Sequence, residues 1–156
     1  MSAILYRMDS GIPGSLTRLN AALVTEPVKL TATNTPAAYG IAVKVDANGA
    51  HAIGAGDNNA DVYGILVRPY PTQGVLEAGQ VVDVMKIGYM SVICRGSATP
   101  VKGGLVYVRT VTGTDTYIGS FSAAANSTNS FVLLGAHWVG GKDANGNAEI
   151  YFNHTV

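Results

Sequence analysis

The stretch that decides the fold is VYGILVRPYPTQGVLEAGQVVDVMKIGYMSVICRGSATPVKGGLVYVR, residues 62–109. Short runs rich in Val, Ile, Tyr and Met alternate in it with turns that contain Gly or Pro. Such runs are typical of β-strands, and the apolar repeat of a long helix is missing. We expect strands over residues 62–67, 81–87, 89–94 and 105–111, with Gly88 separating the second from the third.

Upstream of this stretch, residues 39–45 and 50–53 are apolar runs joined by the turn sequence DANG (46–49). Asn-Gly between two apolar runs is the strongest short signal for a β-hairpin, because both residues tolerate a positive φ. The first run and the strand that opens the long stretch both contain Tyr-Gly-Ile. Glycine inside a strand indicates close passage of another segment, so we expect such an approach at Gly40 and Gly64.

Downstream, residues 131–139 (FVLLGAHWV) predict a buried strand in which Gly135 marks a bulge or a close contact, and residues 148–152 (AEIYF) predict the last strand. Residues 121–130 (FSAAANSTNS) are small and polar, which indicates an exposed loop. In total we expect about nine or ten short strands, spaced by roughly 8–12 residues. This spacing favours an all-β fold, a single jelly-roll-like sandwich or barrel over residues 36–156.

Residues 1–35 differ from the rest and are expected to form an N-terminal arm. Residues 15–24 (SLTRLNAALV) fit a short helix with Ser15 as its N-cap, an extended arm, or a first strand folded into the domain. An extended arm usually gains its order from a partner surface, which its apolar side chains would contact. The candidate contact residues are Ile4, Leu5, Ile12, Leu16, Leu19 and Leu23.

Charge is scarce in this chain of 156 residues: charged residues make up 13%, hydrophobic residues 47%, and the formal net charge is zero. A weakly charged, neutral surface does little to keep copies apart, which hints at assembly, although a weakly charged monomer fits as well. The ten basic residues are scattered singly, which argues against a nucleic-acid partner. No apolar run is long enough for a membrane span and the start lacks a signal-peptide pattern, so we expect synthesis in a cytoplasm.

No catalytic, cofactor-binding or metal-binding cluster stands out, so we expect no enzyme activity and no cofactor. Cys94 is the only cysteine and lies among strand residues, as a buried apolar side chain would. Asp57, Asn59 and Asp61 match the first ligands of a calcium loop, but Val62 occupies the position of its required glycine. The histidines, which show no metal-ligand spacing, are His51, His137 and His154. An enzyme with a dispersed site would need a pocket that holds strongly perturbed titratable groups.

The tyrosines support a second hypothesis of a different class. Half-buried sheet tyrosines with their hydroxyls at the rim are the simplest interpretation. The functional alternative is a contact surface for protein or carbohydrate, which would make the chain a carbohydrate-binding β-sandwich module for host-surface or glycan adhesion. The tyrosines in or beside expected strands are Tyr63, Tyr70, Tyr89, Tyr107, Tyr117 and Tyr151.

Several stretches resemble the structural cement, or capsid decoration, proteins of tailed bacteriophages. The resemblance is one of strand-and-turn pattern, in the family's order, and it covers most of the chain except residues 111–130. The stretches are SGIPGSLTR (10–18), VYGILVRPYPT (62–72), VDVMKIGYMSV (82–92), GGLVYVR (103–109) and LLGAHWVGGKDANGNAEIYFN (133–153).

This resemblance implies an all-β protein of the virion that binds the outer surface of an icosahedral capsid. Proteins of this family lie at junctions between capsomers, contact the major capsid protein and reinforce the shell against the pressure of the packaged DNA. They are commonly dimers or trimers. The family has no catalytic, cofactor or metal residues to transfer to this chain.

Overall fold

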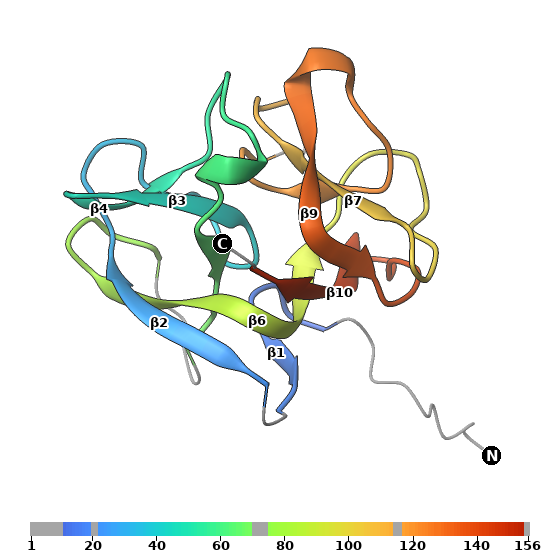
Figure 1. Cartoon of the computed structure of the whole chain (residues 1–156), viewed down its shortest axis with the longest axis horizontal. Coiled ribbons are helices and arrows are strands. Elements are labelled where there is room, and N and C mark those ends of the chain that lie inside the picture. Colours follow the sequence, from blue (N-terminus) through green and yellow to red (C-terminus); the bar gives the residue numbers. More distant parts are fainter. Residues whose placement is uncertain (1–10, 20–21, 70–74, 114–116, 155–156) are drawn as a thin grey trace.

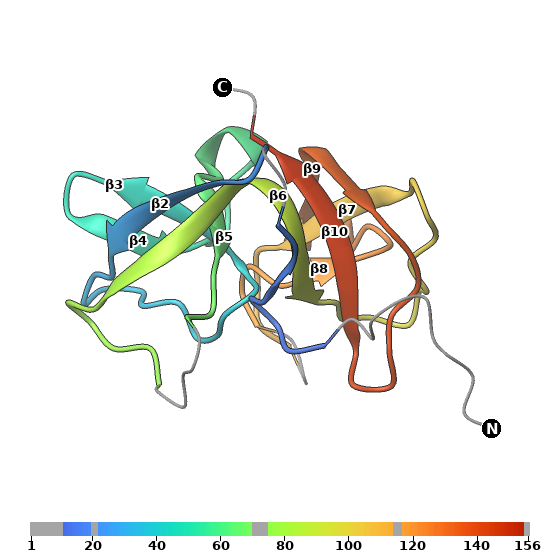
Figure 2. The same ribbon diagram turned by 90° about the horizontal axis from the view of Figure 1, so that it is seen from below.

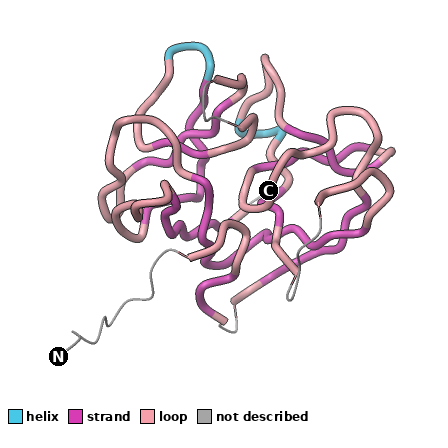
Figure 3. The backbone as a smooth tube through the Cα atoms, turned by 180° about the vertical axis from the view of Figure 1, so that it is seen from behind, coloured by secondary structure: helices cyan, strands magenta, loops and turns pink. Residues whose placement is uncertain are grey.

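The computed structural model describes residues 11–19, 22–69, 75–113 and 117–154. These residues form ten strands and two short 3-10 helices, so the all-β prediction is confirmed. Figure 3 shows that the backbone consists almost entirely of strands and loops. No helix in these ranges is long and apolar enough to cross a membrane.

The elements follow one another at short intervals along the chain. The strands are β1 (Leu16–Arg18), β2 (Val24–Lys29), β3 (Ala42–Asp46), β4 (Gly49–Ala52), β5 (Gly64–Leu66), β6 (Val81–Ile93), β7 (Leu105–Arg109), β8 (Phe121–Ser122), β9 (Ser130–Trp138) and β10 (Asn147–Asn153). The 3-10 helices are η1 (Asn59–Asp61) and η2 (Ser127–Asn129).

Strand β6 organises the sheet and is its longest member, with 13 residues. Its first half pairs with β2 on one edge and β5 on the other, and its second half pairs with β1 and β10. Every ladder between the named strands is antiparallel. Figure 2 shows β6 crossing between a lobe that holds β2 to β5 and a lobe that holds β7 to β10.

The sheet curls back on itself in both lobes. Its main order is β4-β3-β5-β6-β10-β9-β7-β8, with β1 and β2 also on β6 (Figure 1). In one lobe, Leu30 bridges Ala50 and so joins the end of β2 to β4. In the other lobe, Cys94 bridges Phe121 and so joins the end of β6 to β8. The result is a strongly curled, barrel-like sheet, consistent with the predicted sandwich or barrel.

The buried apolar side chains form two hydrophobic cores, and β6 contributes to both of them. Val84 belongs to the smaller core with Ile41 and Leu66, whereas the adjacent Met85 belongs to the larger core. Successive side chains of a strand point to opposite faces, so this part of β6 is buried on both sides. The larger core also contains Trp138, Phe121, Phe152, Met90 and Ile150. Each fully buried large side chain contributes about 1.5–3 kcal/mol.

Two local predictions were wrong. Residues 81–87 and 89–94 do not form separate strands, because β6 continues through Gly88, whose φ of 149° accommodates a bend without ending the ladder. A Cβ at Gly88 would lie 2.7 Å from Leu23 Cδ1. Residues 121–130 are not an exposed loop throughout: Phe121 and Ser122 are buried and pair with β7, because the Phe121 ring fills the larger core.

The N-terminal region joins the sheet. Strands β1 and β2 both pair with β6, in agreement with the alternative in which a first strand folds into the domain. The described part of residues 15–24 contains no helix. The close approaches expected at Gly40 and Gly64 are confirmed, because added Cβ atoms would lie 2.6 Å from Gly14 N and 2.8 Å from Met85 O.

Two glycines, Gly103 and Gly135, have the same φ of 79°, so comparing their substitutions distinguishes the cost of backbone strain from that of a steric clash. A Cβ at Gly135 would lie 2.2 Å from the carbonyl oxygen of Asn153, whereas one at Gly103 would meet nothing within 4 Å. We expect Gly103→Ala to cost about 1–2 kcal/mol of folding free energy, from backbone strain alone. Gly135→Ala should cost about 1–3 kcal/mol more. Chemical denaturation of both variants measures this difference, and equal losses would contradict the close packing of β9 on β10.

Candidate interaction surfaces

The six predicted arm residues fall into three groups. Ile4 and Leu5 lie outside the described residues. Ile12 and Leu19 expose 60% and 81% of their surface, as a contact residue would. Leu16 and Leu23 are partly buried and pack against the larger core. Of the described four, only Ile12 and Leu19 are therefore available to a partner.

A buried carboxylate fastens β1 to the sheet. Glu149 of β10 is only 5% exposed. It accepts hydrogen bonds from the Thr17 hydroxyl at 2.6 Å and from Arg18 Nε at 3.0 Å and Nη2 at 3.2 Å. The hydrogen bond to Glu149, reinforced by its charge, raises the pKa of Arg18 above its ordinary value, against the opposing effect of burial. Removing Arg18 would leave the buried Glu149 carboxylate poorly solvated, so the pair favours one position of β1.

A row of side chains crosses five strands on the face of the sheet that points away from the larger core. Tyr89 of β6 pairs in register with Tyr151 of β10, which pairs with His137 of β9. Arg18 of β1 lies opposite Tyr89, and Leu105 of β7 lies opposite His137. Directly paired residues share a face of the sheet. We call these five residues the outer row.

The members of the outer row touch one another and remain accessible. The guanidinium carbon of Arg18 lies 4.6 Å from the centre of the Tyr89 ring. The ring centres of Tyr89 and Tyr151 are 4.9 Å apart, and those of Tyr151 and His137 are 5.2 Å apart. His137 is exposed, both tyrosines are half-buried, and Leu105 is 57% exposed. The four members from Arg18 to His137 thus form a continuous, solvent-accessible line of side chains, and Leu105 extends it by register.

On the side of the outer row away from Glu149, the neighbouring residues are uncharged. Val24 of β2 pairs with Ile87 of β6, which pairs with Asn153 of β10. Ile87 and Asn153 are half-buried and Val24 is exposed. Aromatic residues and Arg are enriched at protein interfaces, while Lys, Glu and Asp are depleted. This face therefore has the composition of a protein contact surface.

The tyrosines singled out from the sequence are not gathered on one platform. Tyr89 and Tyr151 lie in the outer row, while Tyr63 donates a hydrogen bond to Glu26 at the other lobe. Tyr117 is exposed beside a different cavity. Tyr70 lies outside the described residues. Sequence inspection missed Arg18, His137 and Leu105 as members of the row, because only the pairing register brings them together.

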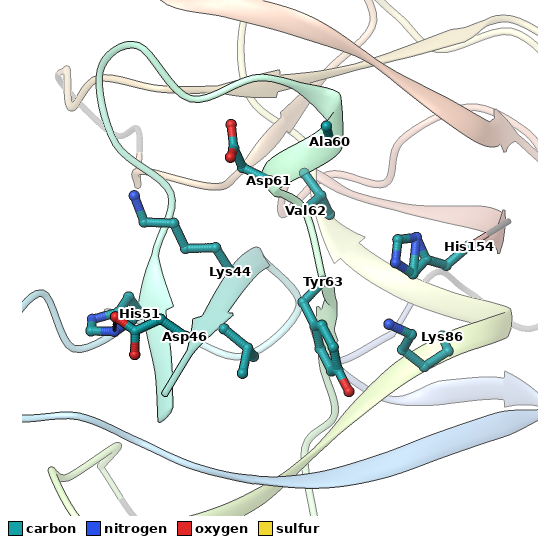
Figure 4. Close-up of a pocket in the computed structure, with 10 residues that line it drawn as sticks. Lys44, Asp46, His51, Ala60, Asp61, Val62, Tyr63, Lys86 and His154 are labelled. Atoms are coloured by element: carbon teal, nitrogen blue, oxygen red, sulfur yellow. Dashed lines mark ion pairs between the residues drawn. The ribbon is translucent and has the colours of Figure 1, made fainter. Parts of the chain in front are cut away.

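A cleft of about 540 Å³ opens between the hairpin β3–β4 and the end of β10. Figure 4 shows Lys86 and His154 on one side of Tyr63 and Lys44, Asp46 and His51 on the other. The Lys86 ammonium lies 3.4 Å from the centre of the Tyr63 ring. The hydrogen bond to Glu26 raises the pKa of Tyr63, and desolvation lowers the pKa of Lys86.

The chemistry of this cleft is that of structural contacts. Tyr63 and Glu26 link the start of β5 to β2, and Lys44 binds Asp57 at 2.7 Å. Asp57 also accepts the Gly54 amide and Asp61 accepts the Asn58 amide, so the residues of the failed calcium motif hold their own loop. Within the described ranges, no group of three His, Cys, Asp or Glu residues is placed to hold a metal ion.

Cys94 is buried, as predicted from its strand context. Burial raises the pKa of its thiol to about 11. The reactive thiolate is therefore scarce near neutral pH, and Cys94 serves as a small apolar side chain at the bridge to β8.

Two histidines should titrate on opposite sides of the ordinary value of about 6.5. The hydrogen bond with Asp46, at 2.8 Å, raises the pKa of His51, whereas burial and then the charge of Lys86 lower the pKa of His154. His51 therefore stabilises the fold at acid pH and loses that effect as pH rises through its folded pKa. His154 does the reverse, because its protonation in the unfolded chain favours unfolding as pH falls.

We expect NMR titration of the imidazole signals to give a midpoint above about 6.5 for His51 and below it for His154. Thermal unfolding supplies the control. The fall in unfolding temperature from about pH 8 to about pH 5 should be smaller in His154→Asn than in the unaltered chain, and larger in His51→Asn. Identical midpoints for the two residues would contradict the described contacts.

Comparison with known proteins identifies the family. A family model described as XM1 gp53 minor capsid protein matches residues 1–152. A solved chain from "The capsid of Myoviridae Phage XM1" has a TM-score of 0.74 and 19% sequence identity, and the alignment covers 99% of this chain and 97% of that chain. This likeness shows a shared fold, and no curated protein matches the chain. The protein belongs to the XM1 gp53 minor capsid protein family and is a structural component of a phage capsid.

Proposed function

We propose that this chain binds the outer surface of an icosahedral phage capsid and cements neighbouring capsomers of the major capsid protein. The observation that carries this proposal is the match to a minor capsid protein family over residues 1–152. A protein of that class, bound at junctions between capsomers, would stabilise the shell by contact alone. No chemical step is required of it.

The physical character of the chain supports such a role. Its two lobes are joined through β6, which contributes to both cores, and this makes the body suitable for transmitting force between the subunits it contacts. Charged residues make up only 13% of the chain, so contacts would depend on apolar and neutral polar groups. Many copies on one shell add weak contacts through multivalency.

The N-terminal region supplies the proposed capsid contacts. Ile12 and Leu19 flank β1 and are exposed, and Ile4 and Leu5 precede them in the sequence. Leu16 packs against the core and Glu149 holds Arg18, so Ile12 and Leu19 lie on either side of a strand that is fixed to the sheet. We propose that these exposed residues, together with Ile4 and Leu5, lie against the major capsid protein.

The test is binding of purified protein to capsids that lack it. The double variant Ile12→Ser, Leu19→Ser should bind at least about tenfold more weakly, with little change in thermal unfolding, because both side chains are exposed. Val81→Ser is the matched control, since Val81 is 65% exposed at the far end of β6. A variant that lacks residues 1–10 keeps β1 and should also bind more weakly.

Two results would contradict the proposal at different levels. Capsid binding of the double variant and of the truncation equal to that of the full chain would exclude the N-terminal contacts. No binding of the full chain to the outer surface of capsids would exclude the cementing role itself.

A further inference from the structure

The outer row suggests a partner because of its order as well as its composition. Across the sheet the sequence of side chains is Arg18, Tyr89, Tyr151, His137, Leu105. The three central members are aromatic rings with neighbouring centres 4.9 Å and 5.2 Å apart. The central part of the row therefore presents rings in the same pattern from either direction.

The charge on this face is already balanced. Arg18 is the only Lys, Arg, Asp or Glu in the row, and both of its hydrogen-bonding nitrogens bind the carboxylate of Glu149. A strongly charged partner would gain little from such a surface, whereas a neutral one loses little on docking. The net charge of the whole chain is zero, so a second copy meets that requirement without long-range repulsion.

A two-fold contact must be complementary to itself, so that each residue faces its counterpart across the axis. An axis that runs along β10 through Tyr151 reverses the row of the second copy. Tyr151 then faces Tyr151, Tyr89 faces His137, and the aliphatic stem of Arg18 covers Leu105. An axis along the row itself would instead bring Arg18 onto Arg18. The first arrangement pairs ring with ring and keeps the two cations apart.

We propose that the outer row is the interface through which two copies of this chain associate face to face, with Tyr151 on the two-fold axis. The proposal names the interface of the homo-oligomer that we expect for the proposed capsid role. It rests on that role only for where the dimer would lie on the shell. The five strands have between 3 and 13 residues. At about 3.3 Å per residue and about 4.8 Å between strands, they cover roughly 600 Å² per copy. That is at the small end for a stable dimer, so we expect association in the micromolar range.

Charge substitution on the axis tests the geometry. Tyr151→Glu and Tyr151→Lys each place two like charges opposite one another, so sedimentation should show each variant at least about tenfold more weakly associated than the unaltered chain. An equimolar mixture of the two should re-associate, because Glu then faces Lys. The mixture staying monomeric, while each variant unfolds at a temperature near that of the unaltered chain, would overturn the proposal.

A milder substitution keeps the test decisive if the charged variants fold poorly. Cys94 is buried, so Tyr151→Cys introduces a single accessible thiol. Two such thiols on the axis should form an intermolecular disulfide under mild oxidation, whereas the control Val81→Cys should remain mostly monomeric. Equal cross-linking of the two variants would contradict the interface.

Failure of this inference and failure of the capsid role give different results. An unaltered chain that is monomeric at all concentrations but binds capsids excludes the interface and leaves the capsid role standing. A chain that dimerises through Tyr151 but does not bind capsids excludes the capsid role and leaves the interface standing.

Discussion

The constraint on which the structure depends is the burial of two neighbouring β6 side chains, Val84 and Met85, in different hydrophobic cores. Val84 packs in the smaller core and Met85 in the larger one, so the strand cannot shift by one residue without exchanging the two cores. The register of β2, β5 and β10 is set against this strand. The residues that β2, β5 and β10 expose are therefore positioned by the burial of β6 side chains.

The outer row follows from that register. Inner positions of β10 such as Ile150 and Phe152 lie in the larger core, so the residue between them, Tyr151, must face outward. The ladder then aligns Tyr151 with Tyr89 and His137 without any further contact being required. Glu149, on the same face, is covered by Thr17 and Arg18, which adds β1 to the row. The same packing that stabilises the fold thus generates its contact surface.

Much of the fold could be predicted from local signals, whereas the register between distant strands could not. The Asn48-Gly49 sequence predicts a hairpin because turn geometry is encoded in adjacent residues, and β3 and β4 confirm it, with Ala47 and Asn48 as the turn between Asp46 and Gly49. In contrast, Arg18 and Glu149 are 131 positions apart, and no local pattern indicates their pairing. Leu16 was expected to contact a partner but packs against the core, because its apolar character alone does not distinguish the two uses.

The family match establishes a capsid protein. The surface indicates how such a chain would act, because a β body carries exposed apolar residues near its N-terminus and an outer row whose single charge is paired with Glu149. Cryo-electron microscopy of virions that carry this protein tests the proposed role most directly. The account predicts density for the chain on the outer surface between capsomers, with Ile12 and Leu19 against the major capsid protein. Density confined to the interior of the shell, or these residues facing solvent, would contradict it.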